Sequence, residues 1–262
     1  MAVSGMFWSV LRSIDRAGMP KIAAALANAV CRDRQFSVDA DGDRVNQQAE
    51  ATFVCPDLVP PRYAYVRGQV IDNWLYEYQP RKGDVVFDIG AGIGEEAVVL
   101  DHMGCQVVSI EAHPRTYRCL VKTIAASGLK NVRALQCAVM DRDGEITIAD
   151  TDDHLANGIG VGSGGGVTVP ARSVASLCHE MGIDTIDFLK MNIEGAERDA
   201  VLGFGDIKIR HMVISCHDFL NVDALRTMAD VRDALTKQGY RITTRPDHPM
   251  SYTRANIYAS LP

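Results

Sequence analysis

One segment, residues 85–94, constrains the fold of this chain more than any other. Its sequence, VVFDIGAGIG, is a short apolar run that leads into three alternating glycines. Glycine lets the backbone turn tightly and approach a ligand closely, because it carries no Cβ. A strand that passes through such a turn into a helix is typical of α/β sheets that bind a nucleoside beyond their strand ends. The segment therefore predicts an α/β fold with a nucleoside cofactor.

The chain after Gly83 supports a parallel sheet, because short apolar runs alternate there with helical patterns. We expect seven strands in a mostly parallel, Rossmann-like sheet with helices on both faces. A short hairpin-like strand at 145–149 and a glycine-rich loop at 157–166 are expected between them. The sheet strands are expected at 84–89, 106–110, 132–138, 186–192, 211–216, 240–244 and 255–259, the last two pairing antiparallel.

Residues 1–80 differ from residues 81–262 and are expected to form a separate, helical N-terminal region. A polar stretch at 39–44 is expected to be a loop or hairpin tip within it. The region would cover an acceptor pocket or form a homodimer contact. Its first 30 residues predict amphipathic helices that dock on the protein, with attachment to a membrane surface or partner as the alternative. No transmembrane helix is expected, because nowhere do 18 uncharged apolar residues run together.

Charge and cysteine content narrow the class of protein. Lys and Arg number 27 against 33 Asp and Glu, a net charge of −6, which does not favour binding to a nucleic-acid backbone. The seven cysteines are an odd number and form no C-x-x-C pair, and several of them lie in apolar runs. Reduced, buried cysteines of this kind predict a cytoplasmic protein.

Acidic residues around the glycine turn indicate which nucleoside binds. Asp88 precedes the first glycine by two positions, and Glu95 stands where a dinucleotide fingerprint has glycine or alanine. Carboxylates at that point repel a pyrophosphate but attract the sulfonium and ammonium groups of S-adenosylmethionine. Glu111 ends the next strand and is placed to hold ribose hydroxyls, a role common to both cofactor classes. S-adenosylmethionine is therefore expected, with a nicotinamide dinucleotide or a plain glycine turn as alternatives.

Three motifs together resemble the FkbM family of S-adenosylmethionine-dependent methyltransferases: FDIGAGIGEEA, IEAHP and DFLKMNIEGAE. The likeness extends from about Gly83 to Ser260 and implies a class I methyltransferase fold. Two positions depart from the family pattern: Asn192 replaces an aspartate, and Ala112 replaces a proline. The resemblance implies a hydroxyl of a sugar, glycan or glycosylated natural product as the methyl acceptor, with a polyketide hydroxyl or N-methylation as alternatives.

The reaction centre is expected where later strands end. Asn192 and Glu194 follow one strand, and His217 and Asp218 follow another. A neutral histidine there can accept the hydroxyl proton as a general base. The alternatives are a Mg²⁺ ion held by these side chains, which is possible but not favoured, and a histidine that only shapes the pocket. Lys190, in an apolar strand, needs a carboxylate partner, Glu194 or Glu197, unless it lies at an exposed edge.

The expected site therefore has two parts, a reaction centre and a cofactor pocket. No resident metal is expected in either. The competing functions are an NAD(P)-dependent oxidoreductase and a non-catalytic cofactor-binding protein. The expected catalytic residues are His217, Asp218 and Asn192. The expected cofactor contacts are Asp88, Gly90, Ala91, Gly92, Gly94, Glu111, Ala112, Ala138, Val139, Asn192 and Glu194.

Overall fold

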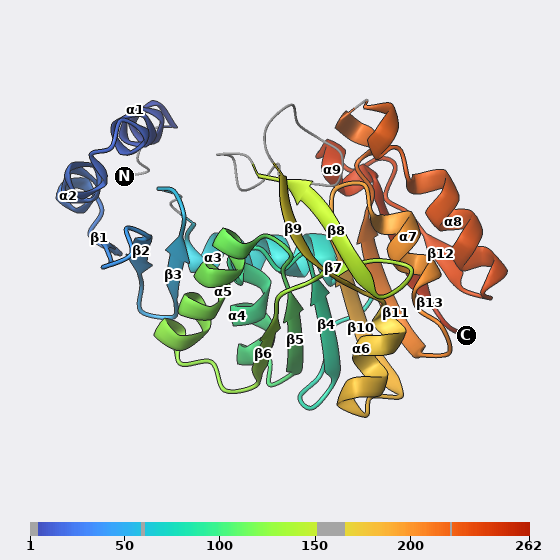
Figure 1. Ribbon diagram of the computed structural model, residues 1–262. Helices are drawn as coiled ribbons and strands as arrows, with labels where there is room; N and C mark the ends of the chain where they lie inside the picture. Colours follow the sequence, from blue (N-terminus) through green and yellow to red (C-terminus); the bar gives the residue numbers. More distant parts are fainter. Residues whose placement is uncertain (1–4, 59–60, 151–165, 221) are drawn as a thin grey trace.

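The computed structural model describes residues 5–58, 61–150, 166–220 and 222–262. Within these ranges the centre of the protein is a seven-stranded sheet in the order β12-β13-β11-β10-β4-β5-β6 (Figure 1). Neighbouring strands run parallel except at β13, which is antiparallel to both β11 and β12. The predicted fold class and the antiparallel final pair are confirmed. The strands are β4 (Val85–Ile89), β5 (Gln106–Ile110), β6 (Val132–Leu135), β10 (Thr185–Met191), β11 (Lys208–Ser215), β12 (Arg241–Thr243) and β13 (Asn256–Ser260).

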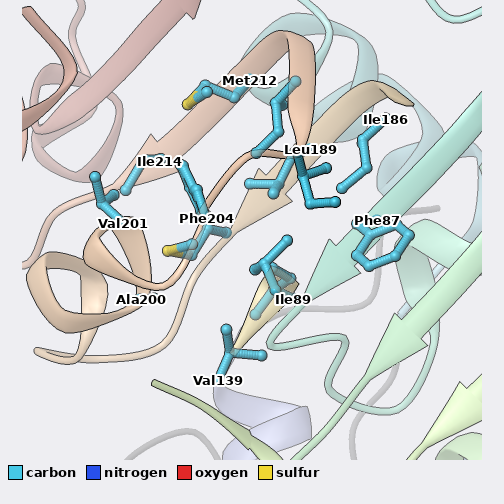
Figure 2. Packing of buried hydrophobic residues seen from close by; sticks show 14 of the residues in the cluster. Phe87, Ile89, Val139, Ile186, Leu189, Ala200, Val201, Phe204, Met212 and Ile214 are labelled. Atoms are coloured by element: carbon cyan, nitrogen blue, oxygen red, sulfur yellow. The ribbon is translucent and has the colours of Figure 1, made fainter. Parts of the chain in front are cut away.

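Helices cover both faces of this sheet, because successive side chains of each strand point to opposite sides. Phe87 and Ile89 of β4 pack with α6 (Val174–Met181), α7 (Glu197–Leu202) and α8 (Met228–Lys237) in the larger core cluster (Figure 2). Val86 points the other way, into a second cluster that includes residues of three further helices. Those helices are α3 (Tyr63–Gln69), α4 (Glu95–His102) and α5 (Pro114–Ser127).

A second, three-stranded sheet lies beside the first, in the order β7-β9-β8. It consists of β7 (Ala138–Val139), β8 (Gly144–Ala149) and β9 (Gly166–Arg172). The expected single strand at 132–138 is thus divided, because its first part pairs with β5 and its end pairs with β9 instead. The expected glycine-rich loop at 157–166 lies outside the described residues except for Gly166, the first residue of β9.

The N-terminal region is only partly helical, which corrects the expectation for residues 1–80. After α1 (Gly5–Arg16) and α2 (Pro20–Val30), the chain forms an antiparallel meander of β1 (Gln35–Val38), β2 (Arg44–Gln47) and β3 (Thr52–Cys55). The polar stretch at 39–43 is the hairpin tip between β1 and β2, as predicted. Side chains of α5 hold the edge of β3: the hydroxyls of Ser127 and Thr123 accept hydrogen bonds from the amides of Thr52 and Val54.

The aromatic pattern at 63–78 predicts a helix, and the structure forms a shorter one there. Helix α3 continues directly into a single π-helical turn, η1 (Val70–Trp74), where the helix ends. The short helix α9 (Ser251–Arg254) precedes β13 and contacts this segment through the hydrogen bond from Thr253 Oγ1 to Asn73 Oδ1. In the described part of the chain, no helix combines the length and apolar character needed to cross a membrane.

Candidate functional site

The glycine turn after β4 is built for close backbone approach. Gly90 has a φ of 72°, and a Cβ there would overlap the carbonyl oxygen of Asn192 at the end of β10. Gly94 has a φ of 93°, and a Cβ there would lie 2.8 Å from Leu120 of α5. Gly92 differs, because a Cβ at that position would have no neighbour within 4 Å. The turn is therefore closed on its protein sides and open at Gly92, where a ligand can approach.

Glu111 stands at the open side of this turn, as the sequence predicts. Its carboxylate accepts hydrogen bonds from the amides of Gly92, at 3.0 Å, and His113, at 2.9 Å. Burial raises the pKa of Glu111 to about 7, although both hydrogen bonds act in the opposite direction. A carboxylate that is fixed by two amides and still carries a raised pKa fits a ligand with hydroxyl donors, such as a ribose.

Asp88 lies beneath the turn, inaccessible to solvent, and forms an ion pair with Lys190. The Lys190 ammonium is 3.0 Å from Asp88 Oδ1, donates to the Gly90 carbonyl at 2.8 Å and lies 5.3 Å from the centre of the Trp74 ring. Neither Asp88 oxygen accepts a well-directed hydrogen bond. Burial raises the pKa of Asp88 to about 6 against the attraction of Lys190. The predicted partners of Lys190, Glu194 and Glu197, were wrong.

A cavity of about 770 Å³ opens beyond the ends of β10 and β11. Three predicted site residues, Asn192, Glu194 and His217, line it together. The two acids that begin α4, Glu95 and Glu96, complete its polar side. Its opposite wall comes from α3, η1, α9 and the segment after β11, and it is rich in apolar and aromatic side chains. Four of these are aromatic: Tyr65, Trp74, Phe219 and Tyr252.

The polar side of the cavity is strongly acidic. Burial and the neighbouring Glu96 raise the pKa of Glu95 to about 7, while Lys190 opposes the shift. Glu96 accepts a hydrogen bond from the Trp74 indole at 2.9 Å. Because Lys190 is already paired with Asp88, a bound cation would relieve the repulsion between these carboxylates. These carboxylates therefore fit the sulfonium and ammonium groups of S-adenosylmethionine.

The loop after β10 is strained at the cavity. Glu194 has a φ of 52° and is the one non-glycine residue with a positive φ among the residues that the structure describes. The sequence pattern predicts a helix at 194–202, but the helix begins only at Glu197, because Glu194 and Gly195 form this turn instead. Strained backbone of this kind costs roughly 1–3 kcal/mol and persists where the surroundings enforce it, often in functional sites.

His217 is held by a carboxylate that the sequence did not single out for it. Its Nδ1 lies 2.9 Å from Oε1 of Glu197, which is wholly buried. The other Glu197 oxygen accepts a hydrogen bond from Thr227 Oγ1 at 2.9 Å, and the Gly195 amide donates to the same carboxylate. His217 itself is 5% exposed and faces the cavity. The carboxylate fixes the imidazole ring and directs its other nitrogen away from Glu197.

Asp218 follows β11 as predicted, but its side chain contacts the start of α8 instead of lining the cavity. Its Oδ2 accepts hydrogen bonds from the amides of Thr227 and Met228, both at 3.1 Å, at the start of α8. Asp218 therefore caps a helix, and Glu197 rather than Asp218 is the partner of His217. The capping explains why an acid follows His217 directly: the chain must turn from β11 toward α8 at that point.

Ala138 and Val139 point to opposite sides of β7. Val139 lies in the larger core cluster, where Figure 2 shows it close to Ile89. Ala138 belongs to a small cluster with Ala112, the residue after Glu111. The structure thus places Ala112 and Ala138 together beside Glu111, where an adenine could lie, and Val139 in the packed interior. Neither Glu111 nor Ala138 is among the described residues that line the cavity.

Comparisons with known proteins match the chain to one family and to several curated relatives. The profile of the "Methyltransferase FkbM domain" family matches residues 88–242. A 2-O-methyltransferase, NoeI of Sinorhizobium fredii, is 26% identical over 140 residues, which cover 45% of this chain and 56% of that protein. The AMB antimetabolite synthetase AmbE of Pseudomonas aeruginosa is 30% identical over 95 residues, covering 35% of this chain and 4% of that protein.

Among solved structures, fibrillarin of Aeropyrum pernix, in complex with natively bound S-adenosyl-L-methionine, is similar with a TM-score of 0.48 and 13% identity. The similarity covers 86% of this chain and 97% of that chain. The chain spans about half the length of NoeI and a small part of AmbE.

Proposed function

The chain belongs to the FkbM methyltransferase domain family, and from this premise we propose that it methylates a hydroxyl oxygen of a glycoside. It is an S-adenosylmethionine-dependent methyltransferase, as the three motifs predict. We propose two further points: the methyl group goes to an oxygen atom, and the acceptor molecule is a glycoside. The observation that supports it best is His217, a buried imidazole fixed by Glu197 at the wall of the large cavity.

The residues around the glycine turn would hold the cofactor. Glu111 is placed to accept hydrogen bonds from ribose hydroxyls, and the open face at Gly92 admits the nucleoside. Glu95 and Glu96 would face the cationic end, where their charge is otherwise uncompensated. When bound, S-adenosylmethionine supplies an electrophilic methyl group.

His217 would remove the proton from the acceptor hydroxyl. With a proton on Nδ1 directed at Glu197, its Nε2 is free to accept the hydroxyl proton as the oxygen attacks the methyl carbon. Glu197 then faces the positive imidazolium that forms. General-base catalysis of this kind contributes about 10²–10⁴-fold to a rate. Orientation of the hydroxyl by the cavity wall supplies a further part.

The lining of the cavity supports a glycoside as acceptor. Tyr65, Phe219 and Tyr252 offer flat apolar faces on which a sugar ring or an aglycone can pack, while Asn192 and Glu194 can bond hydroxyls. Within the described lining there is no lysine or arginine, which disfavours a phosphorylated or carboxylated acceptor. The relative NoeI is by name a 2-O-methyltransferase, consistent with an oxygen acceptor.

Intact-mass analysis of a panel of uncharged glycosides, incubated with enzyme and S-adenosylmethionine, tests this function. We expect a gain of one methyl group on at least one glycoside, and His217→Ala should lower kcat by about 10²–10⁴-fold. Affinity for S-adenosylhomocysteine should be unchanged. His179→Ala, at a half-exposed histidine far from the cavity, is the matched control.

Two results would contradict this assignment. One is methylation of amines but no glycoside in the panel. The other is activity that disappears with EDTA and returns with Mg²⁺, which would replace the histidine base with a metal ion.

Glu197 acts through His217, so it is a positioning residue. Glu197→Gln keeps an acceptor for Thr227 but removes the charge opposite the imidazolium, and kcat should fall about 10–100-fold. KM and the thermal midpoint should change little. Thr227→Val, which removes the other side-chain bond to Glu197, is the comparison: it should affect stability more than kcat. Equal losses of kcat and stability in both variants would mean that Glu197 has only a structural role.

A further inference from the structure

We propose that α1 and α2 form a docking surface for an anionic lipid membrane, with the helices lying in the plane of the interface. The surface consists of apolar side chains that are exposed on these helices and the turn between them, framed by basic side chains. In Figure 1 the two helices lie at one edge of the molecule, away from the central sheet. The proposal does not depend on the acceptor of the methyl group.

The apolar side chains follow helical spacing. Ile22, Leu26 and Val30 are four residues apart and are 52%, 43% and 48% exposed. Residues four apart lie on one face of a helix, so these three form a stripe along α2. Met6 and Val10 repeat the spacing on α1, with 78% and 53% exposure.

This stripe is additional to the face by which the helices pack on the protein. Leu11 of α1 and Ala23 and Ala27 of α2 are buried in a small core with Trp8 and Phe36. Each helix therefore has one apolar face that is buried and a second one that remains in water. The second face has no structural use within the described chain, and exposed apolar patches of this kind mark interaction sites.

The charges around the stripe identify the partner. Between residues 5 and 32, the exposed charged side chains are all basic: Arg12, Arg16, Lys21 and Arg32. None of the four forms an ion pair within the part of the chain that the structure describes. The acid in this segment, Asp15, is buried and bonded to Arg44 at 2.7 Å.

This local positive charge stands against a net charge of −6 for the whole chain. An apolar face framed by cations fits the headgroups and acyl chains of an anionic bilayer. A second copy of the chain fits less well, because a two-fold contact would bring the same cations together. Interfacial binding also suits helices of 12 and 11 residues, which are too short to span a bilayer.

Co-sedimentation of the full chain with vesicles tests the proposal. We expect binding to phosphatidylcholine vesicles with 30% phosphatidylglycerol, weak binding to pure phosphatidylcholine, and release by high salt. Arg12→Gln with Arg16→Gln should weaken binding about 25-fold, at about fivefold per charge. Ile22→Ser with Leu26→Ser should weaken it by at least about tenfold.

Matched controls keep the result interpretable. Val121→Ser and Leu202→Ser change apolar side chains that are equally exposed on other helices, and they should leave vesicle binding unchanged. Every variant should bind S-adenosylhomocysteine like the unmodified chain, which shows that it is folded. Absence of binding to anionic vesicles, equal binding to neutral ones, or a dimer in sedimentation that the Ile22 and Leu26 changes dissolve would each overturn the proposal.

Discussion

At the scale of single residues, the site depends on how buried charges are paired. Lys190 compensates the charge of Asp88 beneath the glycine turn, and Glu197 holds the His217 ring at the cavity, with its Oε1 2.9 Å from Nδ1. The first pair lies near the ends of the neighbouring strands β4 and β10, and the second joins the residue His217 after β11 to the start of α7. A buried ion pair contributes little net stability, but the loss of one partner leaves an uncompensated charge. The first pair therefore fixes the shape of the turn, and the second fixes the orientation of the His217 imidazole at the cavity.

Asp88→Ala should lower the free energy of unfolding by about 3–5 kcal/mol, because the Lys190 ammonium would remain buried without a counter-charge. Asp88→Ala combined with Lys190→Met should restore most of that loss. Urea unfolding of the three proteins measures the effect. If the double variant were as unstable as the single one, the ion pair would not be the cause.

At the scale of elements, the fold places the site where β4, β10 and β11 end. Parallel strands bring their carboxyl ends to one edge of the sheet, so the segments that follow these three strands meet although they are far apart in the chain. The loops that follow these three strands differ in what they contact. The turn after β4 is open for a cofactor, the strained turn after β10 presents Glu194 to the cavity, and the turn after β11 carries His217 and caps α8 with Asp218.

Asp218→Ala should cost about 0.5–2 kcal/mol of stability, because two amides at the start of α8 lose their acceptor. Its kcat should stay within about threefold of the unmodified enzyme, in contrast to the change at His217 one residue earlier. Asp218→Asn keeps an amide-capping oxygen and should be close to neutral. Thermal unfolding and methyl-transfer assays on both variants check this, and a kcat loss as large as that of His217→Ala would make Asp218 catalytic.

At the scale of the whole molecule, the site is an acidic cavity set in an acidic protein. Three carboxyl groups at or under the turn have raised pKa values: Asp88 at about 6, and Glu95 and Glu111 at about 7. The folded protein therefore binds more protons than the unfolded chain between about pH 4 and pH 7. Ionisation of these groups destabilises the empty site as pH rises, and a bound cation removes part of that cost.

The stabilisation caused by a cationic ligand should therefore increase with pH. The thermal midpoint of the ligand-free protein should fall from pH 5 to pH 8, whereas its rise on addition of S-adenosylmethionine should grow by a few degrees. S-adenosylhomocysteine, which lacks the sulfonium charge, should show a smaller growth. Glu95→Gln, which removes one ionisable group, is the control and should flatten both trends. A ligand effect that is independent of pH in all proteins would argue against a cation beside Glu95.

Local sequence was sufficient for most elements of the central sheet and for part of the site. The glycine turn, the acid at the end of β5 and the strands of the sheet follow from short-range pattern, because turns and strands depend on backbone freedom and alternation within a few residues. The same patterns placed Asn192, Glu194 and His217 at strand ends, and the structure brings these three residues to one cavity.

Tertiary structure decided which buried charged side chains pair and which element holds the edge of the meander. Nothing within the strand of Lys190 indicates that Asp88 is its partner, and Glu197 reaches His217 across 20 residues of chain. Side chains of α5 hold the edge of the meander at 35–55, an interaction that the meander's own sequence does not indicate. Charge pairing and edge pairing are contacts between distant segments, so they are set by strand order and packing, whereas turns and strands arise from neighbours along the chain.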